Sequence, residues 1–439
     1  MFRGLSAPRL IVLGFAIFMG LGTLLLKLPV STYNGISWVD ALFVAVSAVS
    51  VIGLSSVEFS STFTHFGSII LMVLIQVGGL GVMTLTTLVA LLIGRRIGFR
   101  DLLTVREELG SVDSARNTLR LLEQIAEITF ITEVAGAAIL AFGFVNGGLS
   151  LGEGLFQAVF HALMAFCNSG FDTISSGGLS SFAGSASVNL AIVTLIVLGG
   201  LGFPVLVNLY RYKEANRLTL HSKRVLVTTA ALILIGVLSV GLLEWTNPAT
   251  LGGNPVGTKL LMSLFQGVTP RTAGFSTLDY SQMYESTLLL QIALMFVGTA
   301  PASTGGDVRV TTLALLVLVV LALARGQEEV SAFRRRIPRQ LIEKALAVVS
   351  LSAVLVIVAT LAIMISDGLK LVPAIFEVTS PFATVGLSLN LSQDLSPFAK
   401  LVVTGVMFWG RVGAITLILT LSDRKVKGYV YPEEDIAIG

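Results

Sequence analysis

The 439-residue sequence contains few charged side chains, one cysteine and three histidines. Charged residues make up 13% of the chain and hydrophobic residues 54%, whereas soluble domains carry about 25% charged residues. This low charge excludes an ordinary soluble protein and predicts an integral membrane protein. One cysteine excludes a disulfide framework, and three scattered histidines argue against a structural zinc site.

Long apolar runs dominate the chain instead. Eight of them are expected to cross a bilayer as helices: 10–29, 66–94, 125–145, 188–210, 225–245, 287–324, 345–365 and 398–421. A 20-residue helix is about 30 Å long, which matches the hydrocarbon core of a membrane. Four shorter apolar pieces lie between alternate pairs: 38–51, 151–167, 257–267 and 372–383. Most of these would cover only about 15–25 Å, so we interpret them as re-entrant helices.

The basic residues support this division. If each short piece returns to its own side, 22 of the 29 Lys and Arg fall on one side of the membrane. Such a bias is typical of cytoplasmic loops, and it predicts that both termini are cytoplasmic. Counting the short pieces as full spans would scatter the basic loops over both sides.

The chain is therefore expected to contain four repeats of span, re-entrant helix, loop and span. We place them at 1–94, 119–210, 225–325 and 341–421, joined by cytoplasmic linkers at 95–118, 211–224 and 326–340 and followed by a cytoplasmic tail at 422–439. The predicted fold class is an all-α integral membrane protein with eight transmembrane helices, arranged pseudo-fourfold around one central pore.

A glycine-containing segment follows each re-entrant piece. The four segments read Val51-Ile52-Gly53-Leu54, Asn168-Ser169-Gly170-Phe171, Thr272-Ala273-Gly274-Phe275 and Thr384-Val385-Gly386-Leu387. The fourth begins like TVGYG, whose backbone carbonyls replace the hydration shell of potassium in potassium channels. Non-helical backbone at membrane depth is tolerated where it lines a cavity or is buried in protein. The first three residues of each segment are therefore candidate potassium ligands. The alternative is that these glycines only allow helices to pack closely.

The third repeat contains an unusual loop within its second apolar run. The run 287–324 has 38 residues, about 57 Å as one helix, so it must be broken, and we place the break at 298–307. The candidate gating residues are Gly298, Ala302, Ser303, Thr304, Gly305 and Gly306, together with Arg411 in the matching span of the fourth repeat. A phosphate-cradling loop is the alternative, but the GK[ST] ending and a preceding strand are missing.

Some polar residues admit two interpretations. Arg411 either holds the 298–307 loop or makes a structural pair, and Arg309 either has a role there or extends to the membrane interface. Asp172 either concentrates cations or caps local backbone. Glu133 is expected to have a structural hydrogen-bond partner, and Cys167 is expected to pack.

The sequence resembles the KtrB membrane subunits of bacterial Ktr-type potassium uptake systems, in the Trk/Ktr/HKT superfamily. The resemblance runs from LGFAIFMGLGTLLLKLPVST through the four glycine segments and the 298–307 loop to YPEEDIAIG. It implies a homodimer in the bacterial cell membrane, with one pore per subunit. It also implies assembly on a cytoplasmic KtrA-like ring that binds adenine nucleotides, and transport promoted by sodium.

The cytoplasmic segments are too short to form a nucleotide-binding domain, so any nucleotide should be bound by the partner. Membrane lipids are expected around the chain, and no nucleic acid. Two functional classes remain: a gated potassium pore, and a sodium-coupled or sodium-permeable secondary cation transporter with broken helices. An enzyme is disfavoured because no nucleophile, metal cluster or acid–base pair recurs. Potassium, and sodium as a second candidate, are the expected ions.

Overall fold

The structure, a computed structural model, describes residues 7–81, 84, 115–175, 177–212, 218–301, 303, 308–327, 330–332 and 335–413. This part of the chain is almost entirely helical, which confirms the predicted all-α class. The exception is a short antiparallel ribbon, β1 (Ser331–Ala332) with β2 (Arg335–Arg336). Short elements lie at α3 (Phe59–Thr62), η1 (Gly178–Phe182) and η2 (Tyr280–Gln282).

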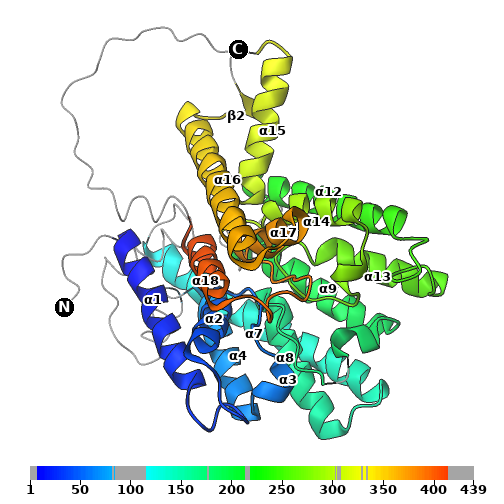
Figure 1. The fold of residues 1–439 in the computed structure, drawn as a ribbon. Helices are drawn as coiled ribbons and strands as arrows, with labels where there is room; N and C mark the ends of the chain where they lie inside the picture. Colours follow the sequence, from blue (N-terminus) through cyan, green and yellow to red (C-terminus); the bar gives the residue numbers. More distant parts are fainter. Residues whose placement is uncertain are drawn as a thin grey trace.

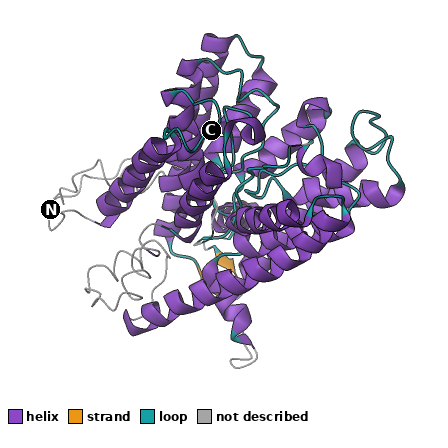
Figure 2. Ribbon diagram, turned by 90° about the horizontal axis from the view of Figure 1, so that it is seen from below, coloured by secondary structure: helices purple, strands orange, loops and turns teal. Residues whose placement is uncertain are grey.

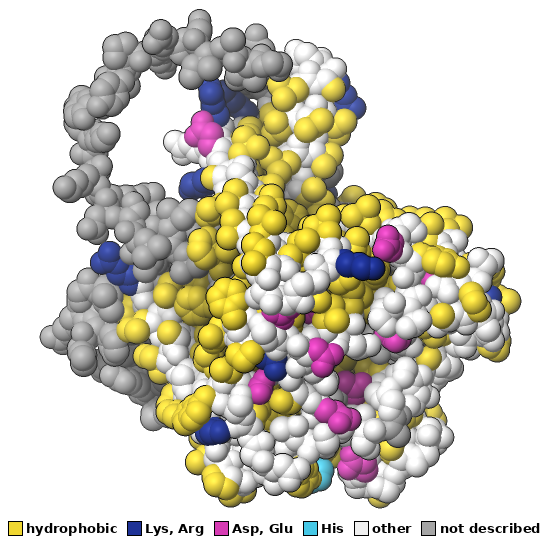
Figure 3. Space-filling model, viewed as in Figure 1, with side chains coloured by type: hydrophobic (Ala, Val, Ile, Leu, Met, Phe, Trp, Pro, Cys, Tyr) yellow, Lys and Arg dark blue, Asp and Glu magenta, His cyan; other side chains and the backbone are white. Residues whose placement is uncertain are grey.

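The first helix of each repeat is long and apolar. These helices are α1 (Ala7–Leu26), α7 (Ala115–Asn146), α12 (Leu220–Leu243) and α16 (Arg339–Asp367). Within the described residues, only these four helices are individually long and apolar enough to cross a membrane, or five spans if a bent pair is counted as one. They expose large apolar side chains such as Leu24, Phe142 and Ile365, and hydrophobic side chains cover much of the surface in Figure 3.

The four predicted re-entrant pieces are short helices. They are α2 (Trp38–Val49), α8 (Leu151–Cys167), α13 (Val256–Val268) and α17 (Leu371–Phe382). Two start at the expected N-caps: Ser37 Oγ accepts from Asp40 N at 3.1 Å, and Ser150 Oγ accepts from Glu153 N at 3.3 Å. Each helix also buries a phenylalanine nine or ten residues before its glycine: Phe43, Phe160, Phe265 and Phe376. The same anchor thus recurs in all four.

The second helices are shorter than the sequence predicts. They are α4 (His65–Leu80), α9 (Ala186–Gly200) with α10 (Phe203–Tyr210), α14 (Glu285–Phe296) with α15 (Val310–Ala324), and α18 (Pro397–Val412). The break in the third repeat is confirmed. The expectation of a continuous helix over 188–210 is wrong, because α9 and α10 meet at an angle of 103°.

A glycine with positive φ explains where these helices end. Gly81, Gly202 and Gly413 have φ of 87°, 83° and 87° and ψ of 138°, 142° and 139°. A residue with a Cβ atom is strained at these φ and ψ angles, whereas glycine is not. The glycine therefore marks the end of the helix at the same place in three repeats. Beyond Gly81 and Gly413, the remainder of the expected spans lies mostly or wholly outside the described residues.

The repeats pack in a closed sequence. The second helix of one repeat contacts the re-entrant helix of the next: α4 with α8, α9 with α13, α14 with α17, and α18 with α2. Figure 1 shows α18 beside α1 and α2, so the last repeat lies against the first. An ion pair between Lys400 Nζ and Asp40 Oδ1 at 2.9 Å joins these two ends. Seen from below in Figure 2, helices surround a central group of loops.

Candidate functional site

The four glycine segments meet at the centre of this arrangement. A Cβ built on Gly53 would lie 2.1 Å from Gly170 N, one on Gly170 2.4 Å from Gly274 C, one on Gly274 2.4 Å from Val385 O, and one on Gly386 1.9 Å from Ile52 O. Each segment thus contacts the segment of the next repeat, and the fourth contacts the first. The backbones approach so closely that a side chain at any of the four positions would force them apart.

The backbone conformation before each glycine is also repeated. The residue two positions earlier has positive φ in all four segments: Val51 (58°), Asn168 (60°), Thr272 (62°) and Thr384 (52°). Such angles are unfavourable for L-residues, above all for β-branched ones. Strained backbone of this kind concentrates at functional sites, and here the same strain occurs four times.

The amide groups of these segments are bonded back to the re-entrant helices. Ser47 Oγ accepts from Gly53 N at 3.2 Å, and Ser47 O accepts from Ile52 N at 2.9 Å. The fourth repeat copies this, because Ser380 Oγ accepts from Gly386 N at 3.1 Å. These hydrogen bonds to the re-entrant helices occupy the amide donors of the segments. One carbonyl oxygen is also occupied, since Ile52 O accepts from Gly170 N at 3.2 Å.

Polar side chains of the re-entrant helices hold the chain beyond the glycine. Glu377 lies nine residues before Gly386, and its carboxylate accepts from Ser388 Oγ at 2.6 Å, Leu389 N at 2.7 Å and Ser392 Oγ at 2.9 Å. Each such hydrogen bond contributes about 0.5–1.5 kcal/mol. Glu377 therefore fixes the outer end of the fourth segment.

The second repeat has its own version of this contact. His161 also lies nine residues before its glycine, and its Nε2 lies 3.2 Å from Oδ1 of Asp172, two residues after that glycine. In the third repeat, the Gln266 amide lies 3.0 Å from Ser276 Oγ. The sequence analysis missed Glu377, His161 and Gln266 as functional candidates. Their signal was a polar residue eight or nine residues before the glycine within an apolar helix.

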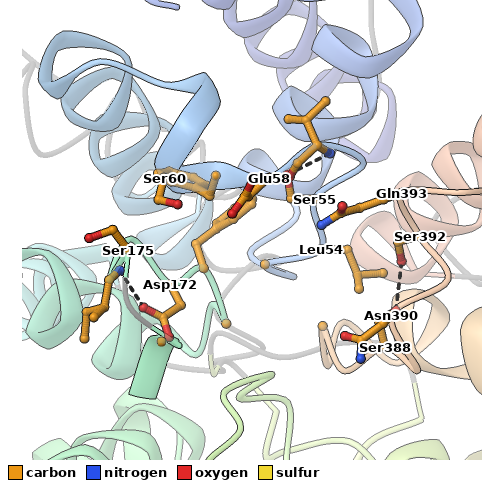
Figure 4. Close-up of a pocket in the computed structure, with 18 of the residues that line it drawn as sticks. Leu54, Ser55, Glu58, Ser60, Asp172, Ser175, Ser388, Asn390, Ser392 and Gln393 are labelled. Carbon is orange, nitrogen blue, oxygen red and sulfur yellow. Dashed lines mark hydrogen bonds between the residues drawn. The ribbon is translucent and has the colours of Figure 1, made fainter. Parts of the chain in front are cut away.

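A vestibule opens on the side of the glycines where these contacts lie. One cavity of about 490 Å³ is lined by Gly53, Gly170 and Gly386, and a second of about 320 Å³ by Gly170 and Gly274. Figure 4 shows the larger one, with Glu58, Asp172, Ser388 and Asn390 around it. The two cavities share lining residues, so all four glycines border the same vestibule.

The vestibule carries negative charge. Glu58, Asp172 and Asp279 line it, and no Lys or Arg is among its described lining residues. Acidic side chains also gather on the lower part of the surface in Figure 3. A concave surface of one charge sign raises the local concentration of counter-ions. Asp172 caps local backbone as well, because its carboxylate accepts from Ile174 N at 2.9 Å and Leu179 N at 2.7 Å.

The break in the third repeat approaches the second one. Gly298 N donates to Val308 O at 2.8 Å, and Val310 N donates to Thr299 O at 3.1 Å, so the two ends of the loop pair with each other. Ala300 N donates to Gly200 O at 3.2 Å. A Cβ on Gly200 would lie 3.0 Å from the Thr299 side chain and 3.3 Å from that of Asn168. The start of the loop therefore lies close to Asn168, at the base of the second segment.

Only part of the predicted gating set is described. Ser303 Oγ donates to Ala300 O at 2.6 Å and lies 2.8 Å from Thr299 Oγ1. Ala302, Thr304, Gly305 and Gly306 lie outside the described residues. Arg309 contacts the loop, since its guanidinium donates to Ala300 O at 3.2 Å.

Arg411 reaches the first repeat. Its guanidinium donates to Gly78 O and lies 5.7 Å from the centre of the Phe15 ring. Gly78 is the first glycine of the 78–81 group in α4, just before that helix ends. Arg411 thus bridges the fourth and first repeats, and its contact with the 298–307 loop stays a prediction.

Two other buried polar residues share one partner. Gln76 bonds to Glu133, which supplies the structural partner expected for that acid. Cys167 Sγ also lies 3.3 Å from Gln76 Oε1. The cysteine is buried in a packed interface, as predicted.

The sequence model of the TrkH family, described as cation transport proteins, matches residues 15–427. The chain belongs to this family. Members of the TrkH family are cation transporters, so this chain is a transporter and not an enzyme, and the resemblance stated from the sequence is confirmed.

Several named proteins are similar over most of their length. The Ktr system potassium uptake protein B of Bacillus subtilis is 37% identical, covering 99% of this chain and 97% of its own. The potassium/sodium uptake protein NtpJ of Enterococcus hirae is 34% identical, covering 100% and 98%. The crystal structure of the potassium transporter TrkH from Vibrio parahaemolyticus superposes with a TM-score of 0.74 at 19% identity, over 95% of this chain and 86% of that one. The fold is therefore that of a membrane transporter.

Proposed function

We propose that this chain carries potassium ions across the cell membrane through a gated pore. The observation that carries the proposal is the closed order of close contacts among Gly53, Gly170, Gly274 and Gly386. It supports four filter strands arranged pseudo-fourfold around one axis within one polypeptide. The potassium uptake named for the Bacillus subtilis relative supports the choice of ion.

The filter ligands are backbone carbonyl groups. They belong to Val51, Ile52, Gly53, Asn168, Ser169, Gly170, Thr272, Ala273, Gly274, Thr384, Val385 and Gly386. Because amides of these segments bond back to the re-entrant helices, carbonyl oxygens remain to replace the hydration shell of the ion. The C-terminal ends of α2, α8, α13 and α17 precede the segments, and their negative dipole ends favour a cation.

A sodium-coupled or sodium-permeable secondary transporter is the second candidate. The name of the Enterococcus hirae relative includes both potassium and sodium, and broken second helices are typical of secondary transporters. Four similar loops within one ring favour a single pathway with one filter. Two alternately accessible halves would place the substrate between inverted repeats instead.

The gate consists of the 298–307 loop and Arg411. The start of the loop lies close to Asn168 at the filter base, and Arg309 donates to its backbone. Arg411 links the last repeat to the end of α4. Its permanent charge would oppose a passing cation, so movement of these broken helices could control flux.

The transporter acts as a homodimer on a cytoplasmic, KtrA-like ring that binds nucleotide. Both termini and the basic linkers face this ring. The word "system" in the name of the Bacillus subtilis relative supports more than one component. Cytoplasmic linkers of this length cannot form a nucleotide-binding domain of their own, so nucleotide regulation belongs to the partner.

Flux through liposomes containing the full chain tests the proposal. Uptake of potassium, rubidium and sodium should be measured with and without a nucleotide-binding partner. We expect potassium and rubidium to enter well ahead of sodium, and the partner to change the rate but not the order. Potassium entry that requires a sodium gradient in fixed stoichiometry would favour the secondary transporter.

A further inference from the structure

Arg271 is a buried charge without a hydrogen-bonding partner for its side chain. It lies three residues after the end of α13 (Val256–Val268) and directly before Thr272, the first residue of the third glycine segment. The residue is 4% exposed, and its Nε, Nη1 and Nη2 atoms have no hydrogen-bond partner among the described residues. A guanidinium is permanently charged and carries five donors. Burial of an isolated charge is very costly, so its presence here requires a physical reason.

The helices around α13 supply no acidic partner. α9 and α12 pack against it, and neither of these two helices contains an Asp or Glu. Glu244 follows α12 directly, but its carboxylate is occupied by other donors, among them Thr250 Oγ1 at 2.8 Å and Tyr284 N at 3.0 Å. Within the described residues, Arg271 is therefore not one half of an ion pair.

Arg271 lies at the inner end of the glycine segments, which is the end away from the vestibule. The glycines and residues that follow them, such as Asp172 and Ser388, line the vestibule (Figure 4), and none of the three residues before each glycine does. Arg271 precedes Gly274 by three residues. The residues three positions before the other glycines are uncharged and also buried: Ser50, Cys167 and Ala383. The ring therefore has one positive charge at its inner end.

The inner end of the ring also has an electric field that favours cations. The four re-entrant helices end just before their segments, and each helix C-terminus is equivalent to a negative charge of roughly half an electron. Arg271 belongs to the last turn of one of them, because its backbone N donates to Val268 O at 2.9 Å. Basic side chains are stabilised at helix C-termini, which explains how this guanidinium persists without a carboxylate. A transported cation would be held by the same field.

We propose that Arg271 is a resident cation at the inner end of the filter, where it lowers the occupancy of potassium and thereby sets the uptake affinity. This rests on the proposed filter, whose inner ligands are the carbonyl groups of Val51, Asn168, Thr272 and Thr384. Adjacent Cα atoms are about 3.8 Å apart, so the guanidinium lies on the order of 10 Å from the nearest of these ligands. At that distance, and with an effective dielectric constant of about 20, repulsion lowers the affinity for a cation roughly tenfold.

This repulsion has a use in transport. Conduction requires that an ion bind well enough to enter the filter but weakly enough to leave it. Four helix C-termini and four sets of carbonyl groups favour binding, and the charge of Arg271 opposes it at the end from which an entering ion leaves.

Rubidium uptake into liposomes at a series of concentrations tests this role. Arg271→Gln and Arg271→Met remove the charge, so we expect the half-saturating concentration to fall roughly tenfold. The maximal rate should fall as well, because a tightly held ion leaves slowly. Arg271→Lys keeps the charge and should keep the wild-type values.

Lys259→Met is the matched control. It removes one positive charge from the same helix, but near the start of α13, where Lys259 Nζ donates to Trp245 O at 3.0 Å. We expect its half-saturating concentration to equal that of wild type. If Arg271→Gln and Arg271→Met behaved like Lys259→Met, the proposal would be overturned.

Thermal unfolding separates this role from a structural one. Removal of one partner of a buried ion pair is strongly destabilising, whereas removal of an unpaired charge also removes the cost of burying it. We therefore expect Arg271→Met to melt at or above the wild-type temperature. A large fall that Arg271→Lys restores would reveal a specific partner and contradict the proposal. So would a wild-type melting temperature that falls when gluconate replaces chloride, if Arg271→Met abolished that fall, because a bound anion would then neutralise the charge.

Anomalous diffraction from wild-type crystals grown in thallium needs no variant. We expect the peak between Val51, Asn168, Thr272 and Thr384 to be weaker than the peak at the ring of glycines, and the two to become equal in Arg271→Gln. Equal peaks in wild type would overturn the role of Arg271 and leave the filter intact. Absence of thallium from all four segments would refute the filter itself, and this inference with it.

Discussion

Replacement of Gly386 by serine should reduce ion selectivity more than any change outside the ring of glycines. Gly386 has φ of +94°, and a Cβ built on it lies 1.9 Å from Ile52 O. Real Cβ contacts essentially never fall below 3.0 Å, so the fourth and first segments must separate by roughly 1 Å. Ile52 O is one of the proposed ligands, and its displacement changes the size of the carbonyl ring.

The size of the effect follows from two costs. A non-glycine residue at positive φ costs about 1–3 kcal/mol, and overpacking costs a similar amount. The segment can relieve this strain by moving, and the movement displaces the carbonyl ligands that distinguish potassium from sodium. A free-energy change of about 1.4 kcal/mol corresponds to a factor of ten, so we expect selectivity to fall at least about tenfold. Gly53→Ser, where the Cβ would lie 2.1 Å from Gly170 N, should behave alike.

The assay is rubidium uptake into liposomes in competition with sodium. Gly405→Ser is the matched control, because it makes the same change in α18 at a site where a Cβ meets nothing within 4 Å. We expect Gly405→Ser to keep the wild-type ratio. If Gly386→Ser and Gly53→Ser were both as selective as Gly405→Ser, the assignment of the filter would be refuted.

Three further predictions concern single contacts. Arg411→Ala should raise flux and weaken its dependence on the partner at unchanged ion preference; unchanged flux in folded protein would contradict a gating role. Glu377→Gln should lower both selectivity and thermal stability, by about 1–3 kcal/mol for the latter, and a wild-type melting temperature would argue against it. Asp40→Asn and Lys400→Met should show a coupling of roughly 1 kcal/mol in a double-mutant cycle, because their ion pair closes the ring. Burial raises the pKa of Asp40, but hydrogen bonds from Ser37 and Lys400 outweigh it and leave that pKa below its ordinary value. The stabilisation should therefore be complete at neutral pH and decline on acidification below the unfolded-state pKa, as unfolding at a series of pH values would test.

Hydropathy and capping predicted the short helices well. The predicted piece 151–167 coincides with α8, and Ser37 and Ser150 cap their helices as expected. These features depend on neighbouring residues, so the local sequence contains them. The existence of a break within 287–324 was also predictable, because no straight helix of that length fits in a membrane.

The bend at Gly202 was not predictable in the same way. Glycine is tolerated within membrane helices, and the run 188–210 has a length that suits a continuous span. The angle of 103° depends on packing against Thr299 and Asn168 near Gly200, which come from other parts of the chain. Contacts of this kind are absent from any local window of sequence.

The contacts behind the glycine segments were missed for a related reason. Glu377 and Ser388 are 11 residues apart, and nothing in their types distinguishes a structural acid from a solvent-exposed one. Alignment of the four repeats on their glycines would have placed His161 beside Glu377 in register. The predicted interaction of Arg411 was uncertain because the sequence does not specify which neighbouring repeat its long side chain reaches.

Anomalous diffraction from crystals grown in thallium, a heavy substitute for potassium, tests the central claim most directly. The account predicts a peak on the axis between Gly53, Gly170, Gly274 and Gly386, coordinated by backbone oxygens from all four segments and lost when sodium replaces thallium. A peak coordinated by side-chain carboxylates elsewhere, or an ion that contacts only one or two of the segments, would contradict a four-strand filter.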